Sequence, residues 1–600
     1  MLRLHFAVAA ALLLGLGGVA PAKEDPLKGL DEDIARAMRE WQVPGLALAV
    51  VKDDAVVLAK GYGVRKLGET TPVNERTLFA IGSVSKSFTA AALGMLVDEG
   101  KMKWDDPVIK HLPSFLLKDP YVTREITLRD LLSHRTGLAR SELVWYGSPA
   151  GREDVLRRMR HAKVSGFRSG FGYQNVMYLA AGQTIPAVAG KSWDEFVGQR
   201  IFKPLGMSSS NTSINAFSKA DNVATPHEKK EGKVEVIPWR NIDNIGGAGS
   251  INSNVVDMAQ WIRLQLGEGT YNKKRLLSSG AVKEMHTPQT VMRLEGTTAK
   301  LFPDTHFLAY GLGWMLQDYR GQKVVQHGGG VDGMVSLVAM IPEKKLGLVL
   351  LTNLEGQQLP TALAFRIFDA YLGPPQRDWS AELRKVTKGL EDLQEDVKKK
   401  QEKDRVTGTK PSLALDRYAG TYKDDLYGTI KVVKEKDKLV LHFGPSFVGD
   451  LEHWNYDTFR ITWRDGHTPK GFVTFRLTPK AKVEELKFEV AGMGDWVAER
   501  AQDKDATPAI TLSKEELRKF VGKYESKAPP LEVSIEMVGD QLKGVAAGLP
   551  TVTLMPLKPT RFKLSDLPAD VFLDFELADG KVKTVTLEQK PVKITLLPKK

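Results

Sequence analysis

One short stretch organises this chain: Phe79-Ala80-Ile81-Gly82-Ser83-Val84-Ser85-Lys86-Ser87-Phe88-Thr89-Ala90. Apolar residues recur from here at helical spacing, which predicts a helix over residues 83–98. Ser83 and Lys86 are three apart, so they share a face of its first turn. A lysine whose pKa is lowered by burial accepts a serine proton, and a helix start offers N–H groups to an anion. The motif predicts a serine nucleophile; a capping serine beside a solvated lysine is the plainer alternative.

Composition sets the broad class of the protein. The 600 residues exceed one ordinary domain and suggest roughly three to four. With 42% hydrophobic and 26% charged residues, the chain is globular. The absence of cysteine excludes disulfides, thiolate metal sites and cysteine nucleophiles. The net charge of +12 is scattered without a basic cluster among aromatics, so we expect no nucleic-acid partner, although anionic cell-wall polymers or membrane surfaces suit this charge.

The N-terminus has the pattern of an export signal. Met1-Leu2-Arg3 is positive, residues 6–14 are apolar, and Ala20-Pro21-Ala22 is a small-residue cleavage site. The apolar run is shorter than the ~20 residues that a membrane span requires. We therefore expect a signal peptide over residues 1–22, cleavage after Ala22, a secreted or periplasmic protein, and no transmembrane span after the signal is removed.

Residues 27–375 read as one α+β domain, in the broad α/β class. Two strands near its start and three near its end, with helices between and at both ends, predict one antiparallel sheet. The terminal helices should cover one face, and the middle of the chain should form a helical region beside the sheet. The expected helices are 30–41, 83–98, 126–138, 178–205, 255–266 and 359–372, and the expected strands are 46–51, 55–61, 324–326, 335–341 and 346–352.

Beyond this domain the sequence repeats itself. Residues 376–411 form a charged, mostly helical linker, and 412–500 and 510–600 carry short alternating strands that predict two small antiparallel β-barrels. The offset between the copies stays near one hundred residues: Tyr418, Tyr422, Phe459 and Phe475 correspond to Phe520, Tyr524, Phe562 and Phe575. Neither copy carries a convergent set of catalytic residue types. We expect the barrels to grip a ligand, form a lid or mediate assembly.

Two further stretches offer groups for acyl transfer. Tyr173 and Asn175 lie in an irregular loop before a helix, in the only Tyr-x-Asn of the chain. A phenol between cations can have a lowered pKa and serve as base; a packed tyrosine beside a helix cap is the alternative. His327-Gly328-Gly329-Gly330 follows a strand, and its glycines allow backbone N–H groups to approach a ligand. Here the alternative is a glycine-rich turn with an incidental histidine.

The order of these three motifs resembles the serine β-lactamase and penicillin-binding-protein superfamily, in its class C-like branch. The likeness covers roughly residues 28–372 and includes similar flanking stretches around Leu131-Leu132-Ser133-His134 and Tyr310-Gly311-Leu312-Gly313-Trp314. A related signature within the superfamily pairs S-x-x-K with K-T-G. The C-terminal barrels resemble lipocalin-like modules attached to some peptidases of this superfamily.

The resemblance implies a role for each residue. Ser83 is the acylated nucleophile and Lys86 its proton partner, and Tyr173 is the general base. Substrate-binding residues are Asn175, His327, Gly328 and Gly329, and the backbone N–H groups of Ser83 and Gly330 form the oxyanion hole. Water hydrolyses the acyl-enzyme, and neither a metal nor an organic cofactor is needed.

One departure narrows the expected substrate. The chain has no Lys-Thr-Gly, and His327-Gly328-Gly329 stands in its place. A histidine is only partly charged at neutral pH and glycine has no hydroxyl, so a substrate carboxylate should be held more weakly. We therefore expect an exported serine hydrolase of esters or amides, an esterase or peptidase acting on a small ester, a peptide or a cell-wall-derived compound. A true β-lactamase or D-alanyl-D-alanine carboxypeptidase and a non-catalytic cell-wall-binding protein are the alternatives, and the oligomeric state stays open.

Overall fold

The structure is a computed structural model of the chain. It describes residues 25–466, 468–490, 494–501, 512–546, 551–564, 571–589 and 592–599. The predicted signal peptide, residues 1–22, lies outside the described residues. The chain divides into two compact units, residues 1–500 and 501–600.

The first unit contains one eight-stranded antiparallel sheet. In spatial order its strands are β2 (Ala55–Gly63), β1 (Gly45–Lys52), β14 (Leu346–Thr352), β13 (Met334–Ile341), β12 (Gln322–Val331), β11 (Met315–Tyr319), β10 (Leu308–Tyr310) and β9 (Thr290–Met292). The five predicted strands form one edge and the centre of the sheet, and β9, β10 and β11 extend it. These three strands have only three to five residues, too few for a clear alternating pattern.

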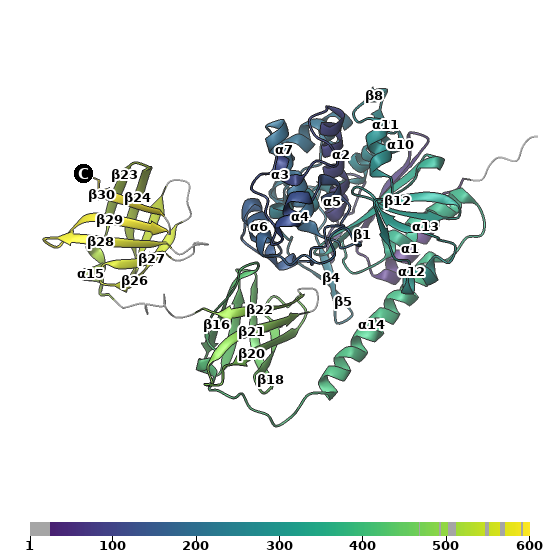
Figure 1. Cartoon of the computed structure of the whole chain (residues 1–600). Helices are drawn as coiled ribbons and strands as arrows, with labels where there is room; N and C mark the ends of the chain where they lie inside the picture. The colour runs from purple at the N-terminus through teal and green to yellow at the C-terminus, as the bar shows by residue number, and fades with distance from the viewer. Residues whose placement is uncertain are drawn as a thin grey trace, which may run out of the picture. The chain divides into compact units, whose positions relative to one another are not determined.

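Each face of the sheet has its own core. Successive strand residues point to opposite faces, so Leu46, Leu48 and Val50 of β1 enter one core, and Ala47, Ala49 and Val51 enter the other. Helices α1 (Leu30–Trp41) and α13 (Leu359–Leu372) cover the first face, as Figure 1 shows. The prediction that the terminal helices cover one face is confirmed. Helix α10 (Val255–Leu266) packs on the other face.

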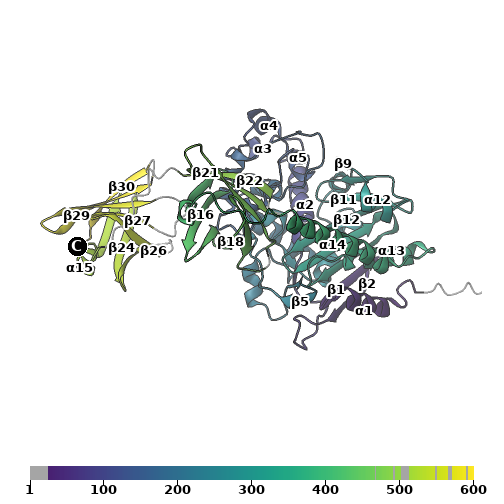
Figure 2. The same cartoon turned by 90° about the horizontal axis from the view of Figure 1, so that it is seen from below.

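A helical region lies beside the sheet, as predicted (Figures 1 and 2). Its centre is α2 (Ser85–Asp98), which is buried on all sides from Ser85 to Leu96. The other helices of this domain are α3 (Val108–His111), α4 (Pro120–Glu125), α5 (Leu128–Leu132), α6 (Arg152–Arg158), α7 (Asn175–Ala189), α8 (Trp193–Val197), α9 (Lys203–Leu205), α11 (Ser279–Met285) and α12 (Gly296–Leu301). Three two-stranded sheets accompany them: β3 (Phe79–Ala80) with β6 (Asn252–Ser253), β4 (His227–Lys230) with β5 (Lys233–Val236), and β7 (Thr270–Tyr271) with β8 (Lys274–Arg275).

The helix expected over 126–138 is shorter in the structure. Thr127 caps α5 in a capping box with Asp130, as the sequence indicates. The helix nevertheless ends at Leu132, because His134 adopts a left-handed backbone conformation with φ 57°. His134 is thereby turned into the interior of the domain.

The charged linker contains one long helix, α14 (Trp379–Lys403), whose first residues pack on the domain and whose remainder is exposed. It agrees with the predicted solvated linker helix. Among the described residues, every helix is too short or too polar to cross a membrane.

Two closed eight-stranded antiparallel barrels follow, and the prediction of two barrels is confirmed. The first comprises β15 (Gly420–Asp424), β16 (Gly428–Glu435), β17 (Lys438–Phe443), β18 (Phe447–Asn455), β19 (Thr458–Trp463), β20 (Gly471–Leu477), β21 (Val483–Val490) and β22 (Gly494–Arg500). A short helix, α15 (Lys514–Arg518), precedes the second, whose strands are β23 (Gly522–Lys527), β24 (Pro530–Val538), β25 (Gln541–Ala546), β26 (Val552–Lys558), β27 (Arg561–Leu564), β28 (Phe572–Ala578), β29 (Lys581–Gln589) and β30 (Val592–Pro598).

The two barrels repeat the same internal contacts. The Tyr422 hydroxyl donates to the carbonyl of Tyr418 at 2.6 Å, and the Tyr524 hydroxyl donates to that of Phe520 at 2.9 Å. The ring of Phe475 packs on Tyr418 as the ring of Phe575 packs on Phe520. The sequence repeat is therefore a repeat of three-dimensional structure.

Candidate active site

The nucleophile motif begins in a 3-10 turn, η1 (Gly82–Val84), which continues directly into α2. The predicted helix is present, but its first turn is tighter than an α-helical turn. Gly82 has φ 50°, a conformation that glycine adopts without steric cost. Ser83 stays partly exposed at this turn, whereas Lys86 is fully buried.

Lys86 makes three polar contacts. Its Nζ lies 2.7 Å from Oδ1 of Asn175, 2.9 Å from the carbonyl oxygen of Ala248 and 2.9 Å from Oγ of Ser83. The first two oxygens can only accept hydrogen bonds. A neutral amine has two N–H groups for them and one lone pair, which is left to face the serine hydroxyl.

The electrostatic surroundings favour that neutral amine. Burial lowers the pKa of Lys86 well below its usual value, and the positive charge of Arg140 lowers it further, while the negative charge of Glu142 opposes the shift. Moving a charged amine out of water costs free energy, so burial favours its uncharged form. Lys86 thus combines a lowered pKa with a direct contact to the Ser83 hydroxyl.

Tyr173 lies close to the motif. Its ring centroid is 4.8 Å from Nζ of Lys86, and the Ser83 hydroxyl acts on its pKa. Burial raises the pKa of Tyr173, whereas we expected from the sequence that neighbouring cations would lower it. The Ser83 hydroxyl and the charge of Arg140 oppose this rise but do not cancel it. The structure thus brings the three predicted catalytic side chains together and holds Tyr173 as a neutral phenol.

Asn175 is the first residue of α7, and Gln174 caps this helix with its own side chain. The capping role is therefore filled by a neighbour, and the Asn175 amide is available for the site. Its Nδ2 donates to the Glu142 carboxylate at 3.0 and 3.3 Å. Glu142 was not among the predicted site residues, because an isolated acidic residue 33 positions before its partner belongs to no recognisable pattern.

The glycines after His327 belong to strand β12 rather than to a turn beyond it. Gly328 and Gly330 are exposed, and Gly329 faces inward. A Cβ atom on Gly329 would lie 2.0 Å from the carbonyl oxygen of Ile81 and 2.9 Å from the Ser83 nitrogen. A Cβ atom on Gly82 would lie 2.7 Å from the Gly330 nitrogen. Only glycine at positions 82 and 329 permits β12 and η1 to approach so closely. The backbone nitrogens of Ser83 and Gly330, the predicted oxyanion hole, both lie at this contact.

His327 is almost fully buried at the back of the site, 2% exposed. Its Nδ1 lies 2.6 Å from the carbonyl oxygen of Gly328, and its Nε2 lies 2.8 Å from the hydroxyl of Tyr310. Burial lowers the pKa of His327 to about 3, so the ring is neutral. Both ring nitrogens have protein partners, and the predicted contact with substrate stays a prediction.

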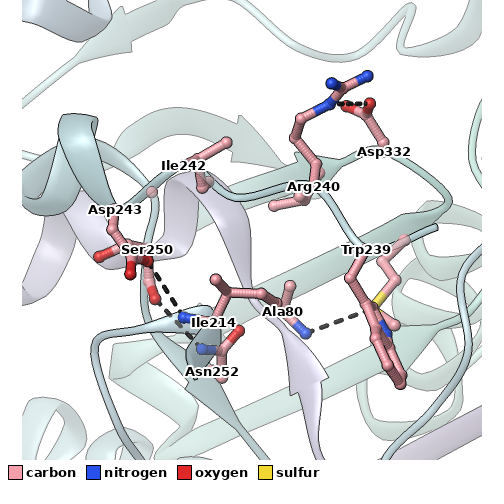
Figure 3. Close-up of a pocket in the computed structure, with 12 residues that line it drawn as sticks. Ala80, Ile214, Trp239, Arg240, Ile242, Asp243, Ser250, Asn252 and Asp332 are labelled. Atoms are coloured by element: carbon pink, nitrogen blue, oxygen red, sulfur yellow. Dashed lines mark hydrogen bonds and ion pairs between the residues drawn. The ribbon is translucent and has the colours of Figure 1, made fainter. Parts of the chain in front are cut away.

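A small pocket of about 10 Å³ lies beside the nucleophile turn, with room for about one water molecule. At its edge Arg240 forms an ion pair with Asp332 at 2.7 Å (Figure 3), and the Tyr146 hydroxyl donates to the same carboxylate at 2.8 Å. These contacts fix the end of β12 next to Gly330. The lining residues are Ala80, Ile214, Trp239, Arg240, Ile242, Asp243, Gly249, Ser250, Asn252, Val331, Asp332 and Met334.

Comparison with known families fits this geometry. The β-lactamase family matches residues 30–372, more than half of the chain. This chain belongs to the β-lactamase family. A domain of unknown function, DUF3471, matches residues 404–504, the region of the first barrel. The resemblance inferred from the three motifs is confirmed, and the chain is a β-lactamase-fold hydrolase homologue.

Its relatives include hydrolases. Unguisins hydrolase ungD' of Aspergillus campestris is 30% identical over 454 residues, which cover 70% of this chain and 80% of that protein. Protein flp of Staphylococcus aureus is 26% identical over 344 residues, 56% of this chain and 65% of that protein. The octameric penicillin-binding protein homologue from Pyrococcus abyssi has the same fold, with a TM-score of 0.53 and 24% identity over 79% of this chain and 100% of that one.

Proposed function

We propose that this family member is a serine hydrolase that cleaves an ester or amide bond through an acyl-enzyme on Ser83. The observation that carries the proposal is the contact between Lys86 and Ser83. A buried amine lies within hydrogen-bond distance of two carbonyl oxygens and of a partly exposed hydroxyl. In its neutral form its two N–H groups go to the two carbonyl oxygens, and its lone pair is left for the hydroxyl. That arrangement is what an activated serine requires.

In the proposed acylation, the Ser83 Oγ attacks the substrate carbonyl carbon as its proton passes to Nζ of Lys86. The carbonyl oxygen becomes an oxyanion held by the N–H groups of Ser83 and Gly330. The bond to the leaving group then breaks, and the leaving group takes the proton from Lys86 through the Tyr173 hydroxyl. The raised pKa of Tyr173 suits a relay that remains a phenol between transfers.

Deacylation reverses these steps with water as the nucleophile. Water gives one proton to the Tyr173–Lys86 pair, its oxygen attacks the acyl carbon, and the same N–H groups hold the second oxyanion. Breaking the acyl bond returns the proton to the Ser83 Oγ. The enzyme is restored without an external reactant other than water.

Neutral His327 supports an esterase or peptidase over a β-lactamase. A substrate carboxylate would find no cationic side chain at this position, since the pKa of His327 is about 3. One relative is named as a hydrolase of unguisins, which supports hydrolysis here but does not identify the substrate. A non-catalytic binding protein is disfavoured because it has no need for an uncharged buried lysine against a serine.

The test is a substrate panel of short p-nitrophenyl esters, D-amino-acid amides and a chromogenic cephalosporin on the parent and Ser83→Ala. We expect ester or amide turnover by the parent, little cephalosporin turnover, and a loss of at least about 10³-fold in Ser83→Ala. Equal labelling of parent and Ser83→Ala by a fluorophosphonate would refute the nucleophile. Efficient cephalosporin hydrolysis would overturn the substrate preference.

We also propose that the protein is exported, on the pattern of residues 1–22. N-terminal sequencing of the mature protein from a bacterial host's periplasm or medium tests this. A mature chain that begins after Ala22 supports export, whereas cytoplasmic protein with an intact N-terminus contradicts it.

A further inference from the structure

Glu142 stands at the start of a 3-10 turn, η2 (Glu142–Val144), and reaches the catalytic residues from the side. Its carboxylate accepts from Nδ2 of Asn175, whose Oδ1 accepts from Lys86 at 2.7 Å. The Glu142 side chain is 14% exposed, and its other partner is the guanidinium of Arg140 at 3.0 Å. An unbroken hydrogen-bond chain therefore runs from Glu142 through Asn175 and Lys86 to the nucleophile.

The two ends of the Asn175 amide are chemically different. The oxygen only accepts hydrogen bonds and the nitrogen only donates them. An ionised carboxylate only accepts, so the amide nitrogen must face Glu142. The amide oxygen must then face Lys86, where it takes one of the two N–H groups of a neutral amine. With Glu142 removed, the amide is free to rotate and present its own N–H groups to the lysine.

We propose that Glu142 is a positioning residue of this active site, which orients the Asn175 amide and holds a negative charge against the Lys86–Ser83 pair. The inference deepens the proposed serine hydrolase function and rests on it. Glu142 acts through Asn175 and through its electric field, without bonding to Ser83.

The negative charge of Glu142 is opposed by the positive charge of Arg140. Glu142 raises the pKa of Lys86, whereas Arg140 lowers it. The Arg140 guanidinium lies 5.7 Å from the ring centroid of Tyr173, and the same two charges shift the pKa of Tyr173 in opposite directions. An exposed ion pair contributes little to stability, about 0–1 kcal/mol. Arg140 is 62% exposed, so its removal tests the field with little effect on folding.

The groups that face this cluster come from several elements. Lys86 stands on α2, and Tyr173 lies in the loop before α7. His134 and His327 carry burial-lowered pKa values and are neutral. Tyr427, from the turn between β15 and β16, has a raised pKa owing to burial, and Glu142 contributes to that rise. The two histidines and the two tyrosines are uncharged at neutral pH, so among these groups Lys86 is the one whose charge sets the acid side of the profile.

The test is the rate of fluorophosphonate labelling of the full-length protein as a function of pH, for the parent, Glu142→Gln and Arg140→Gln. Labelling requires neutral Lys86, so its rate falls as the pH is lowered through the pKa of Lys86. Glu142→Gln removes the charge that raises this pKa, so its acid limb should move to lower pH. Arg140→Gln should move the limb to higher pH. One pH unit below the parent midpoint, we expect Glu142→Gln to retain at least about twice the fraction of its plateau rate that the parent retains.

The plateau labelling rate of Glu142→Gln should also fall, by about tenfold. The double variant Glu142→Ala, Asn175→Ala should lose less activation free energy than the sum of the two single variants, since both residues act through one amide. A purely structural role would lower melting temperatures and leave the limb in place. Acid limbs of both variants that coincide with the parent limb would overturn the inference. A parent that is not labelled at Ser83 would instead refute the proposed function, so the two failures are distinguishable.

Discussion

The Nζ atom of Lys86 lies 2.9 Å from the Oγ atom of Ser83, and it approaches the serine from a fully buried position. The two residues therefore differ in solvent access: Ser83, the proposed nucleophile, is partly exposed, and Lys86, its proposed proton partner, is buried. Burial lowers the pKa of the amine and so favours its uncharged form. The activity and the stability of the domain should both depend on this difference.

The burial of Lys86 should appear in the pH dependence of stability. Its folded pKa is well below its usual value of 10.5, so between these two values the unfolded chain binds more protons than the folded one. Stability should therefore rise with pH across that window, by up to about 1.4 kcal/mol per unit. Lys86→Met removes this contribution. Denaturant unfolding of both proteins at a series of pH values checks it, and a difference independent of pH would show that the lysine is charged when folded.

Gly329 and Gly328 offer a matched pair of substitutions. A Cβ atom at Gly329 would lie 2.0 Å from the Ile81 carbonyl oxygen, whereas at Gly328 its nearest neighbour, the carbonyl oxygen of Ser336, is 3.7 Å away. Gly329→Ala should destabilise the domain by about 1–3 kcal/mol and displace the Ser83 nitrogen. Gly328→Ala should fold normally. Thermal melting and labelling of Ser83 measure both effects, and equal behaviour of the two variants would contradict the close approach of β12 to the nucleophile turn.

Tyr173→Phe separates proton relay from nucleophile activation. Amide hydrolysis should fall by about 10²–10⁴-fold because the departing amine needs a proton. Hydrolysis of p-nitrophenyl esters should fall much less in the acylation step, since p-nitrophenolate leaves without protonation. Pre-steady-state release of nitrophenolate gives the acylation rate. Equal losses for both substrates would place Tyr173 upstream, at the activation of Ser83.

Tyr310→Phe tests whether His327 is held by the protein. The variant removes the hydroxyl that lies 2.8 Å from Nε2 of His327 and leaves this buried nitrogen without a partner. The expected cost is about 1–3 kcal/mol. Tyr121→Phe, at an exposed ring, is the control. A Tyr310→Phe variant as stable as the control would mean that His327 has another partner, such as water or substrate.

The sequence predicted the elements whose signal is local. Helices α1, α10 and α13 and strand β14 occur at the predicted residues, because each combines a sustained apolar period with clear ends. The predicted length of the helix over 126–138 was wrong. The left-handed backbone at His134 ends it early, and the sequence has no glycine at that position to indicate such a conformation. Strand β12 was predicted too short, because three successive glycines are typical of a turn. Here they stay in the strand, where they pair with β13 and pack against η1.

The motifs and their order along the chain predicted Ser83, Lys86, Tyr173 and Asn175 as site residues, because each motif is rare in this sequence and their order resembles that of a known family. Their convergence, the burial of the lysine and the raised pKa of Tyr173 were decided by the tertiary structure, since burial and electric field depend on residues distant in sequence. The position of Glu142 in the site was likewise decided by the tertiary structure alone. No residue beside it predicts its role, and only the packing of η2 against the first turn of α7 brings its carboxylate to the Asn175 amide.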